Sequence, residues 1–375
     1  MRAIITCGNP IKHFILKMKS ITPAPEPLEI TLDMQSFMTS SEYNTTIDLK
    51  EMKTITIIFY SITFILGMFG NSTIIWVTGF KMKKTMSTVW FLNLAVADLI
   101  FVFTLPWNII YRIMDLQWPF GKYFCKFNIA ALYLHIFVSN FLIAVVSIDQ
   151  FCIVAYPLWS RNHRTVMTAT VVALISWASA VCLCLPYFIF AETYTNMTKC
   201  QTNFLFDEDY EKHNTEVLLM KRTNAFFALR LLCSFIIPFS TIVTCYITII
   251  WKLRRNYITQ YSKPFKVFLA VIAVFVICWF PYYIVDVIDV IYKNSVNKDY
   301  YLEKAIDYGR PLADGLVYFN SCINTMMYLC MSQGIREICR KPIWLILKKV
   351  FSDDFLFSTV SRSYSASGTC QYTVC

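Results

Sequence analysis

The chain has 375 residues, of which 57% are apolar and 15% are charged, and its formal net charge is +10. Soluble domains carry roughly 25% charged residues, so this composition excludes an ordinary soluble protein. We assign the positive excess to cytoplasmic loops and a tail that contact membrane lipids and protein partners, and not to a nucleic-acid site.

Seven apolar stretches are long enough to cross a bilayer, which needs about 20 apolar residues per helix. The last of them is the least apolar. They lie near residues 54–80, 88–112, 125–155, 165–190, 224–251, 265–292 and 308–331. The segments between them are too short for a soluble domain. The sequence therefore predicts an all-α bundle of seven transmembrane helices.

We expect four regions along the chain. They are an extracellular segment over 1–53, the bundle over 54–331, a short amphipathic helix lying on the membrane over 332–350 and a disordered tail over 351–375. Basic residues follow the first, third and fifth stretches, whereas the segment 192–216 is acidic. Because basic loops stay in the cytoplasm, the sequence predicts a multi-pass plasma-membrane protein with its N-terminus outside.

Features of the expected outer surface agree with this orientation. Sequons at Asn44 and Asn196 are candidate glycosylation sites, whereas the formal match at Asn71 falls inside the first stretch. Cys125 and Cys200 both fall on the oxidising side. A disulfide between them would pin the acidic loop over the mouth of the bundle, and the alternative is two free thiols.

Polar residues at mid-membrane depth need a functional account because they are costly there. Asp98 is accompanied by hydroxyl and amide side chains on other stretches: Ser139, Asn320, Ser321 and Asn324. Oxygen donors around one carboxylate suit a sodium ion, and a water-filled hydrogen-bond network without an ion is an equal alternative. No other cofactor is expected. We interpret His135, the only histidine within a stretch, as a polar packing residue.

Arg230 falls about two turns outward of Pro238, in the outer third of the fifth stretch. Its guanidinium fits a carboxylate, so either a ligand acid or a protein residue such as Asp286 or Asp314 should face it, and we favour the ligand. The candidate ligand-binding residues are Arg230, Tyr133, Asn108, Asp286, Trp279 and Asp314. Trp279 also precedes Pro281, a helix-weakening residue, so the pair is a candidate switch.

A set of residues in a fixed order resembles the rhodopsin-like G-protein-coupled receptors. It comprises Gly70-Asn71, Leu94 to Asp98, Cys125, Asp149, Trp177, Pro238 with Tyr246, Cys278 to Pro281, and Asn324 with Tyr328. Within that class, Trp118 to Gly121, Pro157 to Arg164 and Ser262 to Val267 are similar to the chemoattractant group of formyl-peptide, chemerin and complement anaphylatoxin receptors. The resemblance implies an extracellular peptide or lipid-acid ligand, a heterotrimeric G protein of the inhibitory class and arrestin as partners.

Two departures from the family pattern fall at the end of the bundle that is expected to face the cytoplasm. The family's Asp-Arg-Tyr box is Asp149-Gln150-Phe151 here, and its Asn-Pro-x-x-Tyr box is Asn324-Thr325-Met326-Met327-Tyr328. Formyl-peptide receptors also carry an aspartate where this chain has Tyr133. Asp149, Gln150, Asn324 and Tyr328 are therefore candidate coupling residues, and we expect weakened coupling.

Three rival functions are considered. A decoy receptor that binds ligand and internalises through arrestin is the alternative within the class. A transporter usually has repeated halves, which this sequence does not show. An enzyme needs a nucleophile with a base or a metal cluster, and no such constellation is found.

Overall fold

The computed structural model describes the backbone of residues 27–193, 199–206, 214–255, 262–295, 297 and 299–331. Residues 1–54 form one unit, whose described part is the first half of helix α2 (Pro27–Trp76), and the second unit begins at Ile55. Asn196, the predicted amphipathic helix over 332–350 and the tail over 351–375 lie outside the described residues, as do the side chains of Asn44 and Tyr328.

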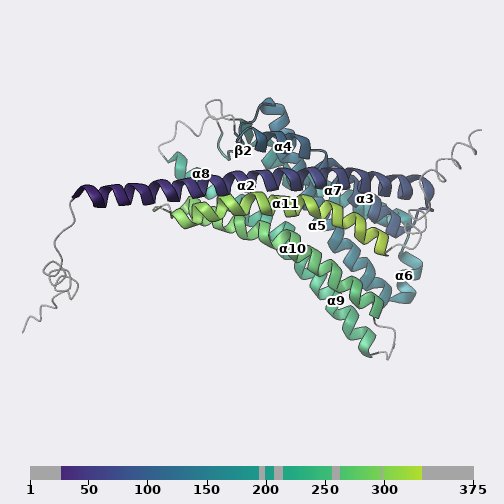
Figure 1. Cartoon of the computed structure of the whole chain (residues 1–375). Coiled ribbons are helices and arrows are strands. Elements are labelled where there is room, and N and C mark those ends of the chain that lie inside the picture. The colour runs from purple at the N-terminus through teal and green to yellow at the C-terminus, as the bar shows by residue number, and fades with distance from the viewer. Residues whose placement is uncertain are drawn as a thin grey trace, which may run out of the picture. The chain divides into compact units, whose positions relative to one another are not determined.

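The described chain is almost entirely helical (Figure 1). After α2 come η1 (Val77–Lys81), α3 (Met86–Val102), α4 (Leu105–Ile113), α5 (Gly121–Ala155), α6 (Pro157–His163), α7 (Val166–Ile189), β1 (Ala191–Thr193), β2 (Cys200–Thr202), α8 (Thr215–Leu231), η3 (Leu232–Ile236), α9 (Ile237–Arg255), α10 (Ser262–Asn294) and α11 (Tyr300–Met331). The elements η1 and η3 are π-helices.

The helices account for all seven predicted membrane stretches. Among the described residues, six helical segments have the length and apolar composition of a span, from Lys50–Lys81 through Ile272–Asn294. The seventh is α11, whose first half carries Asp307, Arg310 and Asp314 among other charges, which is why it is the least apolar. The all-α architecture is confirmed.

Proline residues mark two of the breaks between helices. Pro106 lies in the first turn of α4 and cannot continue the backbone hydrogen bonds of α3, so the second predicted span consists of two helices. Pro157 begins α6, whereas Pro186 and Pro281 lie inside α7 and α10.

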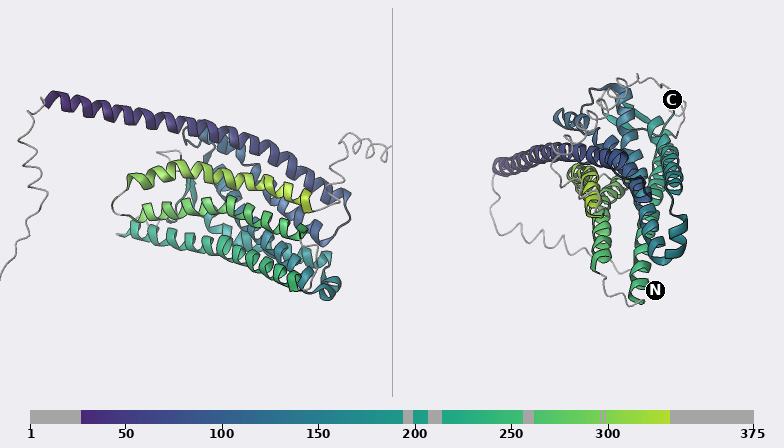
Figure 2. Two further views of the ribbon diagram at one scale, coloured as in Figure 1. Left: turned by 60° about the horizontal axis from the view of Figure 1, so that its bottom comes forward. Right: turned by 90° about the vertical axis from the view of Figure 1, so that its right-hand side faces the viewer.

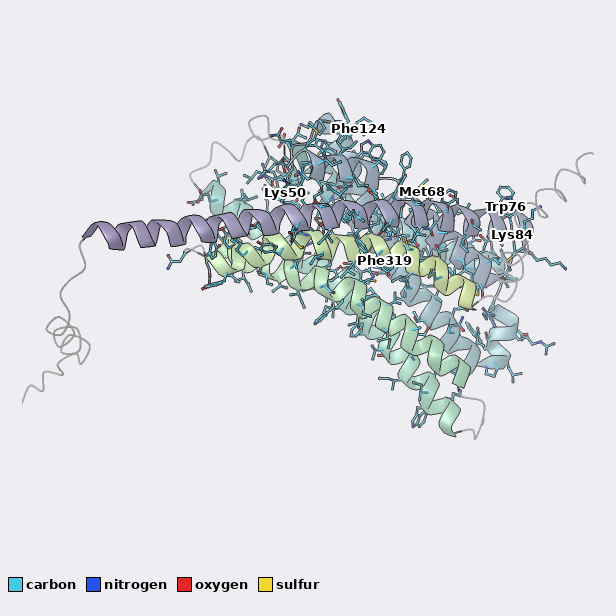
Figure 3. All side chains as sticks on the ribbon, viewed as in Figure 1. Lys50, Met68, Trp76, Lys84, Phe124 and Phe319 are labelled. Carbon is cyan, nitrogen blue, oxygen red and sulfur yellow. A yellow bond between two sulfur atoms is a disulfide. The ribbon has the colours of Figure 1, made fainter. Side chains whose placement is uncertain are left out.

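Within the unit that begins at Ile55, α5 is central. It packs against α3, α7 and α9, while α10 lies along α11, as Figure 2 shows. The indole of Trp177 on α7 donates to Asn93 Oδ1 on α3 at 3.0 Å. Large apolar side chains such as Phe69 are exposed on the outer faces of the helices, as expected for lipid contact. Phe319, labelled in Figure 3, packs its ring 5.6 Å from that of Phe59.

The predicted disulfide joins Cys125 at the start of α5 to Cys200 on β2. Strands β1 and β2 form an antiparallel hairpin in which Thr193 pairs with Cys200. Just before Cys125, Gly121 adopts φ +76°, a conformation that side chains disfavour, and its carbonyl accepts from the buried indole of Trp118 at 3.0 Å. The disulfide between Cys125 and Cys200 therefore connects the hairpin to the start of α5.

Candidate ligand-binding site

Arg230 lies at the end of α8, directly before the π-helix η3. Pro238 follows in α9 and has no backbone N–H, so the carbonyl of Ser234 loses its helical donor. The Asn140 amide on α5 donates to that carbonyl at 2.7 Å instead, and the Ser234 hydroxyl donates to the carbonyl of Arg230 at 2.6 Å. Side-chain hydrogen bonds therefore stabilise the irregular turn that positions Arg230.

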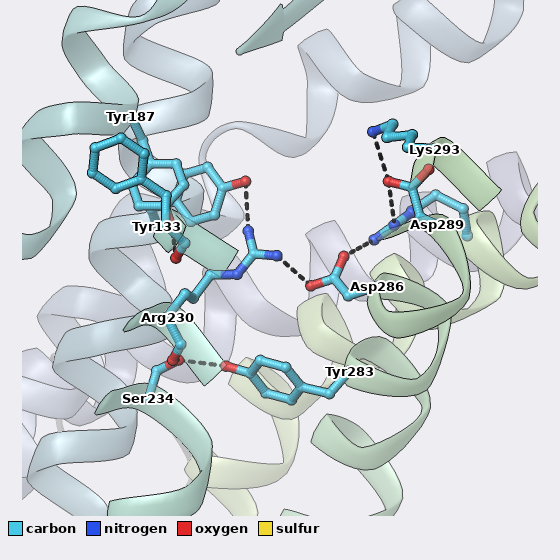
Figure 4. A network of polar contacts seen from close by, with 10 residues as sticks. Tyr133, Tyr187, Arg230, Ser234, Tyr283, Asp286, Asp289 and Lys293 are labelled. Carbon is cyan, nitrogen blue, oxygen red and sulfur yellow. Dashed lines mark hydrogen bonds and ion pairs between the residues drawn. The ribbon is translucent and has the colours of Figure 1, made fainter. Parts of the chain in front are cut away.

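The guanidinium of Arg230 is buried and contacts two protein side chains (Figure 4). Its Nη2 donates to Asp286 Oδ2 on α10 at 2.5 Å, and its Nη1 donates to the hydroxyl of Tyr133 on α5 at 2.8 Å. The residue is 7% exposed, and its Nε has no hydrogen-bond partner among the described residues. Of the two alternatives, ligand acid or protein acid, the structure places a protein acid, Asp286, against Arg230.

Aromatic rings surround the same guanidinium. The ring centroids of Tyr133, Phe227, Tyr187 and Tyr282 lie 5.1 to 5.9 Å from its central carbon. Tyr133 stacks on Tyr187 at 3.7 Å. Cation–π contacts of this kind stabilise a cation where water is excluded. The cage fixes the direction in which Arg230 points.

Asp286 is shared between two arginines. Its second oxygen, Oδ1, accepts from Arg310 Nη1 on α11 at 2.6 Å. Arg310 also lies 3.6 Å from Asp289, which pairs with Lys293 at 2.8 Å. Three cations thus face two carboxylates, which leaves one positive charge in excess. Of the two arginines that share Asp286, Arg310 is the more accessible to an incoming anion, because its side chain is 25% exposed against 8% for Arg230.

The remaining predicted ligand residues have other partners. Asp314 pairs with Arg112 at 3.8 Å and not with Arg230. The Asn108 amide donates to Asn128 Oδ1 at 2.7 Å. Trp279 is fully buried and lies against the rings of His135 and Phe275. The structure therefore brings together Arg230, Tyr133 and Asp286, and places the other three in separate contacts.

At the predicted inner end, Asp149 accepts two hydrogen bonds from Arg164, which follows α6. Hydrogen bonding to Asp149 raises the pKa of the Arg164 guanidinium, so it stays charged. Gln150 next to Asp149 is half-buried. In α11, the hydroxyl of Thr325 donates to Asn71 Oδ1 at 3.0 Å. Helix α11 runs through Thr325 to Met331, the last residue that the structure describes.

The residues predicted to surround Asp98 are all buried, with Ser139, Asn320, Ser321 and Asn324 on α5 and α11. His135 is also there, with its Nε2 at 2.9 Å from Asp98 Oδ1. The interpretation of His135 as a packing residue is therefore incomplete, because its partner lies on another helix. No group of three metal-binding side chains of the His, Cys, Asp and Glu types occurs in the described part of the chain.

Sequence reasoning missed Arg310, and it assigned Arg164 only to a basic loop. Arg310 stands one residue before Pro311, in a stretch of α11 that also carries Asp307 and Asp314, and no role was predicted for it. The sequence carries no signal for this contact, because the partner of Arg310, Asp286, lies on another helix, α10.

Comparisons with known proteins agree with the transmembrane bundle described above. Residues 70–328 match the family model described as 7 transmembrane receptor (rhodopsin family). The chain is 32% identical over 339 residues to chemerin-like receptor 2 of Homo sapiens, which covers 90% of this chain and 92% of that one. It is 36% identical over 319 residues to formyl peptide receptor 2 of Mus musculus, covering 84% and 90%. With the C3a anaphylatoxin chemotactic receptor of Danio rerio it shares 33% identity over 315 residues, covering 84% and 81%.

Proposed function

Since the chain belongs to the rhodopsin family of seven-transmembrane receptors, in its chemoattractant group, we propose that it binds an extracellular peptide or lipid acid through a carboxylate. Family membership makes it a multi-pass plasma-membrane receptor and not an enzyme. The ligand would bind in the half of the bundle where α5, α8, α10 and α11 carry Tyr133, Arg230, Asp286 and Arg310. In this proposal that half faces outward, on the same side as the N-terminus.

The observation that supports the ligand class is the sharing of Asp286 by Arg230 and Arg310. Two guanidiniums offer more donors than one carboxylate can accept, and Arg230 Nε is unsatisfied within the described structure. A ligand carboxylate would dock on Arg310, the more exposed of the two, and share or displace Asp286. Charge-assisted bonds of this type are strong where water is excluded.

The proposed experiment measures binding of chemoattractant peptides and lipid acids to cells that express the full chain. Each binder is compared with its carboxamide, on wild type and on Arg310→Ala and Arg230→Ala. We expect the carboxylate to bind about 10- to 100-fold more tightly than the amide on wild type, and this preference to vanish in Arg310→Ala. Equal binding of acid and amide by wild type would contradict the proposal.

Arg222→Ala is the matched control for this experiment. Arg222 lies on the same helix, α8, but its guanidinium donates to the carbonyl of Phe204. Its removal should leave the acid-to-amide ratio unchanged. Surface expression of every variant is measured with an antibody to a tag, so that a loss of protein is not taken for a loss of affinity.

For signalling we propose coupling to an inhibitory G protein, with the decoy receptor as the second candidate. The residues at the cytoplasmic end of the bundle favour weak coupling. Arg164 already donates to both oxygens of Asp149, and Gln150 has no charge with which to contact a G protein. G-protein activation and arrestin recruitment are compared in wild type and in Gln150→Arg with Thr325→Pro. Robust ligand-driven activation by wild type would exclude the decoy function, whereas arrestin recruitment alone would support it.

A further inference from the structure

The buried carboxylate of Asp98 faces nitrogen donors from two other helices. Its Oδ1 lies 2.9 Å from His135 Nε2 on α5, and its Oδ2 accepts from the Asn324 amide on α11 at 3.1 Å. Asp98 and His135 are 0% and 1% exposed. An N–H group directed at each oxygen satisfies the carboxylate without any added ion.

The side chains that would complete a sodium site are arranged differently. A small hard cation needs oxygen ligands that converge on one point. Here the Ser321 hydroxyl contacts His135 Nε2 at 3.3 Å, and the amide of Asn324 presents its nitrogen to Asp98. The Ser139 hydroxyl and the Asn320 amide have no hydrogen-bond partner within the described structure, and neither side chain is anionic. As folded, these residues do not fit sodium.

A column of stacked rings from four helices holds the imidazole in place. Tyr318 on α11 stacks on Phe101 of α3 at 4.1 Å, and Phe101 stacks on His135 at 4.3 Å. On its other side His135 lies 6.1 Å from Trp279 of α10, nearly parallel to it. Phe101, His135 and Trp279 are at most 1% exposed. Moving the imidazole out of such packing would open a cavity, which is costly.

We infer that His135 replaces a bound cation at Asp98, so that this receptor does not respond to sodium. The imidazole N–H donates to Asp98 Oδ1, the oxygen that an ion would coordinate. The ring occupies the space next to that oxygen. Removing the ring should leave Asp98 short of one donor, with the Ser321 hydroxyl next to the vacated space. A variant without the imidazole should therefore acquire a sodium site.

The test measures the midpoint of thermal unfolding of the purified full chain in sodium chloride and in choline chloride, at equal ionic strength and one pH. No ligand is added, so the result is independent of the proposed function. We expect the same midpoint for wild type in both salts. For His135→Ser and His135→Ala we expect a lower midpoint in choline and an upward shift of at least about 2 °C in sodium.

Adding Asp98→Asn to His135→Ser should abolish the sodium shift, which locates the ion. Two results would overturn the inference. One is a sodium shift in wild type that Asp98→Asn removes, because the site would then accept sodium beside the imidazole. The other is a complete lack of response in both His135 variants, because the ring would then not be what excludes the ion. If neither variant can be purified, the wild-type comparison still decides.

Discussion

Both oxygens of Asp149 accept hydrogen bonds of 2.8 Å from one guanidinium, that of Arg164. The two residues are separated by the end of α5 and all of α6. The bidentate pair therefore fixes the loop between α5 and α7 to the helix that carries Gln150. A lysine could not reproduce this fork.

Arg164→Ala should destabilise the receptor, because Asp149 is only 5% exposed and would lose its cation. The loss should be about 1–3 kcal/mol, less than for a fully buried pair because the Arg164 side chain is 27% exposed. Thermal unfolding of purified receptor measures it. Arg161→Ala, which changes an exposed residue of α6, is the control, and equal midpoints for the two variants would refute the expectation.

Thr325→Val should cost about 1 kcal/mol of stability, because it removes the hydroxyl that donates to Asn71 while keeping the shape of the side chain. Thr325→Ser retains the hydroxyl and serves as the control. Basal G-protein activation should rise in the valine variant if the bond between α2 and α11 restrains the inner end. A valine variant as stable as the serine variant would show that the bond contributes nothing.

Asp286→Asn should destabilise the receptor more than Arg310→Ala does. The first change leaves both Arg230 and Arg310 without their shared charge, whereas the second leaves Arg230 paired with Asp286. Breaking a buried pair costs about 3–5 kcal/mol. Replacing Arg230 and Asp286 together by leucine should cost less than Asp286→Asn alone, and thermal unfolding of the three variants tests this order.

Replacing both Cys125 and Cys200 by alanine should lower stability by up to about 4 kcal/mol, because the bridge closes a loop over a sequence separation of 75 residues. The hairpin β1–β2 should become accessible to protease in the intact cell. Cys182→Ala, a change at an exposed free thiol of α7, is the control. Unchanged protease resistance of the double variant would argue against a structural role for the bridge.

Much of this architecture follows from local sequence. Apolar length predicts six of the spans, whereas the charges of α11 make the seventh the least apolar. The shared oxidising side predicts the pairing of Cys125 with Cys200. Asp286 was predicted, with Asp314, as a protein alternative to a ligand acid facing Arg230, and it is Asp286 that Arg230 contacts. These predictions depend on how deep each residue lies in the membrane, and the position of a residue within its apolar stretch indicates that depth.

What the sequence could not predict depends on how each helix is rotated about its axis. Arg310 and His135 find partners on α10 and α3, and no spacing within their own helices indicates this. The same applies to Arg164, whose partner depends on the path of a short helix, α6. Rotation is set by side-chain packing between helices, so it becomes visible only in three dimensions.

The π-helix η3 contains more residues per turn than the α-helices on either side. If the same residues wound as an ordinary α-helical turn, the segment before them would be rotated by roughly 100° around the axis. Arg230 would then point away from Asp286. A single surplus residue in this turn thus determines the azimuth of the guanidinium, and with it whether Arg230 reaches Asp286.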